Sequence, residues 1–503
     1  MLIEDVEVAV VANLEDGRHD PHADSIALAD VEIDDDTQRT PPRMVRPPGK
    51  TQVSEHHDPA AALRYARNIV AATRHPVRIA AGLVVLLGVA LAAAAVSGVF
   101  RPPRPSLTPA QIAEQKAIRA TKRLLAQQAK VVRAADALVA VTLPQQSSRL
   151  SAAPAIPANL FATPLAPVEV LGYVPYWEAP DLTAADFADT SVLAIYGVEV
   201  ARNGGFLESG PGWAYYADTG YRALTAAAHS AGDRVLFTIA TTGEGVISNL
   251  THNPAPTSAR LAAAMADAVT SGGFDGVDID IEGASHGDRA GFVSFVADFV
   301  SALRHHGMHK MVVLNCYPQS AGSSTDFFDV AKLAPLVSQI FVMDYDMEQD
   351  ANSSANAPLT NGDLGLSDVL SLIQYRRVVP ASKLVLGIPF YGVDFTTMTG
   401  KPGSLTRTES PTVETYSTIA AAGGTPLWDP GSQTVWTRFR EGAKWHETWF
   451  DDPVSVALKR ALASEFHLAG VGAWALGFEG NATGMLEALD GGSPPKRVSV
   501  ASH

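Results

Sequence analysis

From residue 168 onward, strand-like apolar runs alternate with segments whose apolar positions recur at helical spacing. The runs number eight and cover Val168–Val174, Val192–Val200, Arg234–Ala240, Gly276–Glu282, Met311–Tyr317, Gln339–Met347, Lys383–Tyr391 and Gly470–Leu476. Helices are predicted between the strands, for example over Thr257–Ser271, Asp288–His306 and Pro453–Phe466. Eight strand–helix units in roughly 300 residues predict an α/β fold, a (β/α)8 TIM barrel over residues 168–490. No Gly-rich phosphate loop follows the first strand, which argues against a nucleotide-binding sheet.

One long uncharged run stands apart from this alternation. Ile79–Phe100 holds 22 residues rich in Ala, Val and Leu. At about 1.5 Å per residue such a helix is about 33 Å long, enough for the hydrocarbon core of a bilayer. The run lies too far from the N-terminus for a cleaved signal peptide. We therefore predict one transmembrane helix, although basic residues flank it on both sides and leave its orientation open.

The segments around this run are predicted to carry no packed domain. Residues 1–75 are acidic, contain Pro and are poor in aromatic residues, which is typical of a disordered tail. Within residues 101–167, Thr108–Val141 predicts a long helix with partial heptads, either a coiled-coil stalk or a helix lying on the catalytic domain. Residues 144–167 are rich in Pro, Ala and Ser and predict a linker, and residues 491–503 a second disordered tail.

Charge and cysteine content limit which partners the protein can bind and which interactions can stabilise its fold. The formal net charge is −15, which argues against nucleic acid as a partner. Cys316 is the only cysteine, so the chain can form neither an intrachain disulfide nor a cysteine zinc cluster. The fold must therefore be stabilised by its core, and 47% of the residues are hydrophobic.

The densest chemical signal is a row of carboxylates in Phe274–Gly283. Asp278, Asp280 and Glu282 occupy every second position, with aliphatic residues between them. In a strand this alternation points the three acids to one face. Neighbouring carboxylates repel one another, so at least one should have a raised pKa. Glu282 ends the row, and a carboxyl that stays protonated near neutral pH there is a general acid.

Two other interpretations of this row remain at the level of the local sequence. Asp278-x-Asp280-x-Glu282-Gly283 imitates the start of a calcium loop, but the twelfth position of such a loop should be a Glu and is Arg289 here. An edge strand with a solvated acidic face would show the same spacing.

The row also resembles the signature Asp-Gly-x-Asp-x-Asp-x-Glu of glycoside hydrolase family 18, the chitinase family. Asp275, Gly276, Asp278, Asp280 and Glu282 fill every fixed position of that signature. Further matches extend the resemblance over about residues 168–490. The family has a TIM barrel and needs neither a metal nor an organic cofactor. The resemblance therefore implies a TIM barrel without a metal or cofactor for this chain.

The resemblance implies one catalytic role for each acid of the row. Glu282 is expected to protonate the leaving glycosidic oxygen and later to activate water. Asp280 is expected to bind the acetamide N–H of the substrate and to stabilise the oxazolinium intermediate, while Asp278 shares a proton with it. Tyr345 is expected to hold the acetamide oxygen, with Asp346 nearby. The substrate's own N-acetyl oxygen would act as the nucleophile.

Matches at other predicted strand ends imply the residues that bind the sugar. The sixth strand carries Met343, Tyr345 and Asp346 where the family has Met-x-Tyr-Asp, and the spacing predicts that all three face the barrel interior. The third strand carries Thr238 where the family usually has Ser-x-Gly-Gly, so that match is partial. The implied substrate-binding residues are Tyr173, Trp177, Thr238, Met343, Tyr391 and Trp474. Of these, Trp474 should form the pocket floor through a cis peptide bond to Ala475.

The implied function is substrate-assisted, retaining hydrolysis of β-1,4-linked N-acetylglucosamine polymers such as chitin or its oligomers. The first and last strands also look like the branch that includes cell-wall lytic members, so peptidoglycan stays open as a substrate. A non-catalytic carbohydrate-binding protein or a surface scaffold on the same barrel is the competing class. Because such polymers lie outside the cell, the barrel is expected to be extracellular and the N-terminal tail cytoplasmic. A reduced lobe is expected within Asp394–Lys444, with a shallow cleft.

Overall fold

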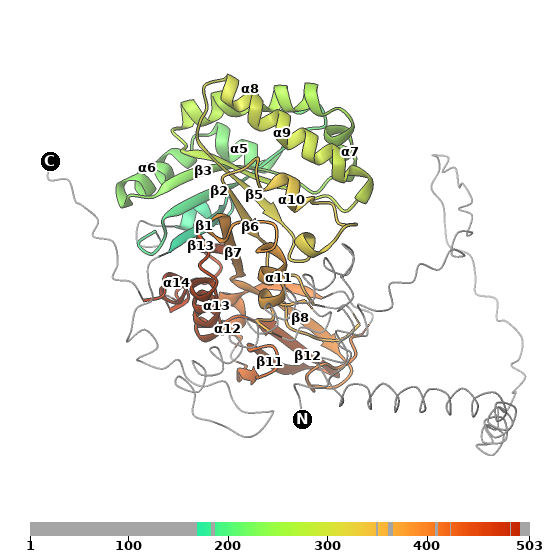
Figure 1. Ribbon diagram of the computed structural model, residues 1–503. Coiled ribbons are helices and arrows are strands. Elements are labelled where there is room, and N and C mark those ends of the chain that lie inside the picture. Colours follow the sequence, from blue (N-terminus) through green and yellow to red (C-terminus); the bar gives the residue numbers. More distant parts are fainter. Residues whose placement is uncertain are drawn as a thin grey trace, which may run out of the picture. The chain divides into compact units, whose positions relative to one another are not determined.

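A computed structural model describes seven ranges of the chain, residues 168–182, 187–348, 351–360, 366–407, 411–422, 424–482 and 484–492. The predicted N-terminal tail, the run Ile79–Phe100, the stalk and linker, and residues 493–503 lie outside these ranges. Within them, none of the helices is both long enough and apolar enough to cross a membrane. The described chain forms a closed barrel of parallel strands and a separate antiparallel sheet (Figure 1).

Eight parallel strands close the barrel in the order β1-β13-β7-β6-β5-β4-β3-β2, so the first strand pairs with the last. Their bounds are β1 Glu169–Pro175, β2 Val192–Glu199, β3 Arg234–Thr241, β4 Gly276–Ile281, β5 Met311–Cys316, β6 Gln339–Val342, β7 Leu384–Pro389 and β13 Gly470–Trp474. The predicted TIM barrel is confirmed, and each predicted strand overlaps an observed one. The carboxyl ends of all eight strands meet at one end of the barrel, where sites of this fold lie.

Helices connect the strands and cover the outside of the barrel (Figure 1). They are α5 Pro211–Ala217, α6 Tyr221–Ala231, α7 Glu244–His252, α8 Pro254–Gly272, α9 Arg289–His305, α10 Val330–Leu333, α11 Asp368–Tyr375, α13 Pro453–Glu465 and α14 Gly484–Asp490. Short 3-10 turns lie at η1 Ala179–Asp181, η2 His286–Asp288, η3 Ser320–Gly322 and η4 Ala381–Lys383. The start of α13 follows from its sequence, because Asp452 and Ser455 form a reciprocal capping box around Pro453 at the first turn.

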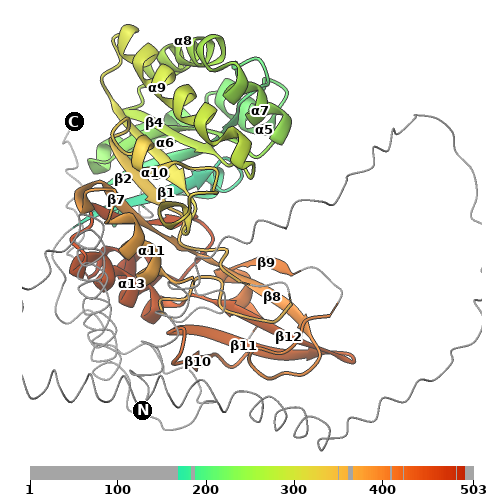
Figure 2. The ribbon, with the colours of Figure 1, turned by 45° about the vertical axis from the view of Figure 1, so that its right-hand side comes forward.

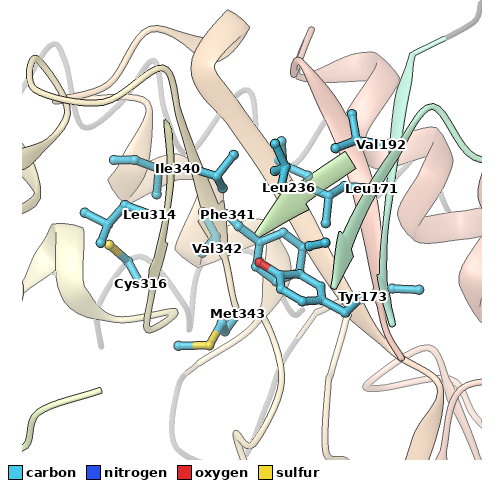
Figure 3. Close-up of a cluster of buried hydrophobic side chains, with 14 of the residues drawn as sticks. Leu171, Tyr173, Val192, Leu236, Leu314, Cys316, Ile340, Phe341, Val342 and Met343 are labelled. Carbon is cyan, nitrogen blue, oxygen red and sulfur yellow. The ribbon is translucent and has the colours of Figure 1, made fainter. Parts of the chain in front are cut away.

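The barrel interior is a packed core rather than a channel. Figure 3 shows the ring of Tyr173 beside that of Phe341, among aliphatic side chains from several strands. The two ring centroids lie 5.0 Å apart in an edge-to-face arrangement, which is a favourable geometry for aromatic pairs. Both side chains are buried, so Tyr173 brings a single hydroxyl into this apolar environment.

Most predicted strand bounds lie within two residues of the observed ones, but one predicted strand ends early and another is divided between two sheets. β6 ends at Val342, five residues before the predicted end, because the N–H of Asp344 bonds back to the carbonyl of Val342 at 2.8 Å. Asp346 then adopts a φ of 56°, in the left-handed region. The predicted strand Lys383–Tyr391 belongs to two sheets, since β7 ends at Pro389 and the next strand begins at Tyr391.

The insertion between the last two barrel strands forms a five-stranded antiparallel sheet in the order β10-β11-β12-β8-β9 (Figure 2). Its elements are β8 Tyr391–Thr397, β9 Thr412–Thr415, α12 Tyr416–Ala421, β10 Leu427–Asp429, β11 Thr434–Glu441 and β12 Lys444–Phe450. The lobe therefore extends beyond the predicted range at both ends. Trp436 and Trp449 stack across β11 and β12 with centroids 5.6 Å apart, which gives the sheet its own apolar contact.

A fully buried lysine links α13 to two other parts of the chain. The Lys459 ammonium donates to Asp451 at 2.9 Å and to the carbonyl of Ala357 at 2.6 Å, and it lies 3.3 Å from Asp368. Burial raises the pKa of Asp368 to about 7, and Lys459 partly offsets that rise. The cluster holds more carboxyl groups than ammonium groups, so it depends on this one positive charge.

Replacing Lys459 by Met should destabilise the barrel by about 3–5 kcal/mol, because two buried carboxyl groups would lose their cation. Urea denaturation of the full chain measures the loss. Lys332→Met is the matched control, since Lys332 pairs with Asp329 on the surface with its side chain 68% exposed. Exposed pairs contribute less than about 1 kcal/mol. Equal denaturation midpoints for the two variants would contradict this account of the cluster.

Candidate active site

The predicted acid row lies on β4, and its alternation is the one the sequence predicts. Asp278 and Asp280 are 0% and 5% exposed on one face of the strand, and the intervening aliphatic residues are buried on the other. Glu282 follows the strand directly, and its N–H bonds the carbonyl of Thr241 at 2.9 Å. A buried central strand excludes a solvated edge strand, and the extended backbone excludes a calcium loop.

A cavity of about 370 Å³ opens in front of this row. The side chains that line it come from the carboxyl ends of five barrel strands and from the first lobe strand, namely Tyr196, Asp280, Glu282, Asn315, Tyr317, Pro318, Gln319, Met343, Tyr345, Asp346, Tyr391 and Trp474. The lining contains three carboxyl groups and no Lys, Arg or His. The cavity is therefore acidic and rich in aromatic surface. Such a lining suits a neutral sugar whose leaving oxygen must be protonated.

Asp278 lies behind the cavity and touches residues of the barrel core. The Tyr173 hydroxyl lies 3.2 Å from Asp278 Oδ1 and donates to Asn315 Oδ1 at 2.8 Å. Asn315 Nδ2 in turn donates to Asp280 Oδ1 at 2.9 Å. Thr238 pairs in register with Asp278 on the adjacent strand β3. Asp278 and Asp280 make no direct hydrogen bond in the described structure, so Asn315 and Tyr173 connect them.

The segment after β6 supplies the opposite wall of the cavity. Tyr345 is buried, and its ring lies edge-to-face with that of Tyr391 at 5.9 Å. The Tyr391 hydroxyl donates to Asp346, whose own N–H donates to Asn356 Oδ1 at 2.8 Å. These bonds hold Asp346 in its left-handed conformation, so its carboxyl points into the cavity beside Tyr345.

Aromatic side chains extend from the cavity floor toward solvent. Trp474 lies at the end of β13, and its ring centroid is 4.8 Å from that of Tyr196. Trp177 follows at 6.1 Å from Tyr196 and is 45% exposed. The peptide bond between Trp474 and Ala475 is cis, as the family resemblance implies, and that between Tyr196 and Gly197 is also cis.

Burial and mutual repulsion give the three acids of the row different pKa values. Burial raises the pKa of Glu282 to about 8, with added repulsion from Asp280 and then Asp346. Burial also raises the pKa of Asp280, but Asn315 offsets part of the rise and the value is about 6. The pKa of Asp278 lies well above its usual range because of burial and then Asp280. Near neutral pH this order favours a proton on Glu282 and a negative charge on Asp280.

The structure brings most of the predicted site residues together. Asp280, Glu282, Tyr345, Asp346, Met343, Tyr391 and Trp474 line the cavity. Asp278, Tyr173 and Thr238 lie behind it and contact the acid row rather than the open space. Trp177 lies outside the lining and contacts Tyr196. The lining residues that the sequence did not single out are Tyr196, Asn315, Tyr317, Pro318 and Gln319. Groups of three or more metal-binding side chains are absent from the described residues.

This arrangement of barrel, acid row and aromatic floor defines a glycoside hydrolase domain. The family model of glycosyl hydrolases family 18 matches residues 170–479, more than half of the chain. The chain therefore belongs to glycosyl hydrolase family 18, as its acid row indicated.

Individual relatives are distant. The chain is 24% identical over 225 residues to di-N-acetylchitobiase of Mus musculus, covering 40% of this chain and 60% of that protein. It is 24% identical over 246 residues to mouse chitotriosidase-1, covering 41% of this chain and 49% of that protein. The chain thus spans about half to three fifths of the length of these curated relatives. A family 18 N-acetylglucosaminidase from Paenibacillus barengoltzii has the same fold, with a TM-score of 0.55 and 19% identity over 65% of this chain and 100% of that structure.

The protonation states predict a bell-shaped dependence of kcat/KM on pH. Activity should rise as Asp280 ionises around pH 6 and fall as Glu282 loses its proton around pH 8. Asp280→Asn removes a negative charge that raises the pKa of Glu282, so that pKa should fall and the alkaline limb should move to lower pH. Asp298→Asn, an exposed change of the same kind on α9, should leave both limbs in place. An alkaline limb that does not move in Asp280→Asn would contradict this coupling.

Proposed function

We propose that the barrel hydrolyses β-1,4-linked N-acetylglucosamine polymers, such as chitin or its oligomers, with retention of configuration and with the substrate's acetamide as nucleophile. The observation that carries the proposal is the placement of Glu282 and Asp280 side by side in one cavity, where burial and repulsion raise the pKa of Glu282 above that of Asp280. The names of the chitobiase and chitotriosidase relatives point to the same class of substrate.

In the first step Glu282 gives its proton to the glycosidic oxygen while the bond from that oxygen to the anomeric carbon breaks. The acetamide carbonyl oxygen of the same sugar forms the new bond to the anomeric carbon, which yields a cationic oxazolinium ring. Asp280 is ionised, so it accepts the acetamide N–H and lies close to the positive charge. This electrostatic stabilisation is the contribution that a fixed, buried carboxylate can make.

In the second step the ionised Glu282 takes a proton from water as the water oxygen attacks the anomeric carbon. The bond to the acetamide oxygen breaks, and the product keeps the original configuration. Tyr345 holds the acetamide oxygen, and its neighbour Asp346 is fixed by Tyr391. Trp474 forms an apolar floor under the sugar.

Glu282→Gln keeps the size and hydrogen bonding of the side chain but removes the acid. The rate on N-acetylglucosamine oligomers should fall by about 10²–10⁴-fold, while binding survives, because Trp474, Tyr345 and Asp280 remain. Turnover of oligomers by the purified full chain and calorimetric binding of the same oligomers measure the two effects. Full activity in Glu282→Gln would place the catalytic acid elsewhere.

Peptidoglycan is the second candidate substrate, because the predicted membrane run would hold the enzyme at the cell's own wall. Incubation of the full chain with chitin oligomers and with purified peptidoglycan, followed by product identification, separates the two. Binding of either polymer without products, in an intact protein, would instead support a non-catalytic carbohydrate-binding protein.

We also propose that Ile79–Phe100 spans the membrane once, with residues 1–75 inside and the barrel outside. The support is the length and uncharged composition of that run together with a polymeric substrate that lies outside the cell. Protease added to intact cells should remove the barrel and spare the tail, as followed by antibodies against each. A barrel protected in intact cells and degraded after lysis would overturn this orientation.

A further inference from the structure

We propose that Asn315 is a positioning residue that acts through Asp280, keeping this carboxylate ionised and oriented for the substrate's acetamide. This inference rests on the proposed function. Asn315 lies on β5, next to the strand β4 that carries the acid row. The Asn315 amide lies between the Tyr173 hydroxyl and Asp280, accepting from the first and donating to the second.

Asn315 is the one polar side chain of β5, which otherwise reads Met-Val-Val-Leu and Cys. It is 2% exposed and lies in the lining of the catalytic cavity, next to the acid row of the neighbouring strand. A buried amide is costly unless its polar atoms are hydrogen-bonded. Both ends of this amide are used, and both partners belong to the candidate catalytic site.

The orientation of the amide follows from the chemistry of its two partners. Oδ1 faces the Tyr173 hydroxyl, which has a proton to donate, at 2.8 Å. Nδ2 faces the Asp280 carboxylate, which accepts, at 2.9 Å. A flipped amide would set its own oxygen against the carboxylate oxygen and lose this donor. The Asn315 amide can therefore accept from Tyr173 and donate to Asp280 in one orientation only.

The contacts form a directed chain of hydrogen bonds. A protonated Asp278 can donate to the Tyr173 oxygen, which lies 3.2 Å away, while the Tyr173 hydroxyl donates to Asn315 and Asn315 donates to Asp280. Each donor in such a chain strengthens the next. At the end of this chain Asp280 receives an N–H from Asn315.

The consequence for Asp280 is both electrostatic and geometric. Burial raises the pKa of Asp280 and the Asn315 amide lowers it, because a hydrogen bond donated to a carboxylate favours the charged form. The bond also holds Asp280 through Oδ1, which orients the carboxylate and leaves Oδ2 outside this contact to accept the acetamide N–H of the substrate. The residue thus helps to determine the lowest pH at which the enzyme works.

The test compares kcat/KM across pH for the full chain and for Asn315→Leu, which has similar size and no hydrogen-bonding atoms. Loss of the donor should raise the pKa of Asp280 and move the acid limb to higher pH by about one unit. At a pH below that limb, activity should fall about tenfold relative to the parent. The alkaline limb should stay in place, since it reports Glu282, which Asn315 does not contact.

Two further variants separate positioning from packing. Asn315→Asp keeps an acceptor for Tyr173 but replaces the donor by a like charge, so its acid limb should move in the same direction and further. Cys316→Ala is the matched control, because Cys316 is the next residue of β5 and equally buried but, at the alternate strand position, lies outside the cavity lining. Its pH profile should match that of the parent, even if its stability falls.

Titration of the Asp280 carboxyl by carbon NMR, assigned by comparison with Asp280→Asn, does not require turnover. A higher pKa of Asp280 in Asn315→Leu than in the parent supports the proposal, even if the parent hydrolyses no substrate offered and the proposed function fails. An unchanged pKa of Asp280, or a uniform loss of activity with both limbs in place, would overturn it. Circular dichroism confirms that each variant is folded.

Discussion

Three carboxyl groups that share one face of a buried strand cannot all be ionised, and this constraint shapes the candidate site. β4 provides the face, and its burial raises the pKa of each acid. The structure resolves the conflict by giving the acids different surroundings. Asp278 is fully buried, Asp280 receives an amide donor, and Glu282 faces the cavity beside the carboxyl groups of Asp280 and Asp346. A proton is therefore retained where a leaving group would need it.

The barrel makes this arrangement possible because parallel strands deliver their carboxyl ends to the same place. Tyr173 from β1, Asn315 from β5 and Asp278 from β4 meet although they are far apart in the chain. The lobe adds a fourth contribution, since Tyr391 begins its first strand and fixes Asp346. The site thus depends on strands held by the core and on one contact from the inserted sheet.

The fold and the acid row could be predicted because the local periodicity of apolar and polar residues indicates each of them. Eight apolar runs separated by helical segments indicate the barrel, and alternation in β4 places the acids on one face. The convergence of Met343, Tyr345 and Asp346 was predicted correctly but for a reason that is wrong, because the strand ends at Val342 and a turn directs the side chains. Asn315 and Tyr196 were not predicted as site residues, because the position of a residue in a strand does not show which distant residue it will contact. The polar Asn315 within an apolar run was the available signal.

The roles of Glu282 and Asp280 depend on where the protons lie, and a neutron crystal structure at neutral pH locates them directly. We expect deuterium on Glu282 and on Asp278, a bare Asp280 carboxylate, and an Asn315 N–D directed at Asp280. Deuterium on Asp280 together with an ionised Glu282 would contradict the assignment of acid and stabilising charge, and with it the proposed order of events in the cavity.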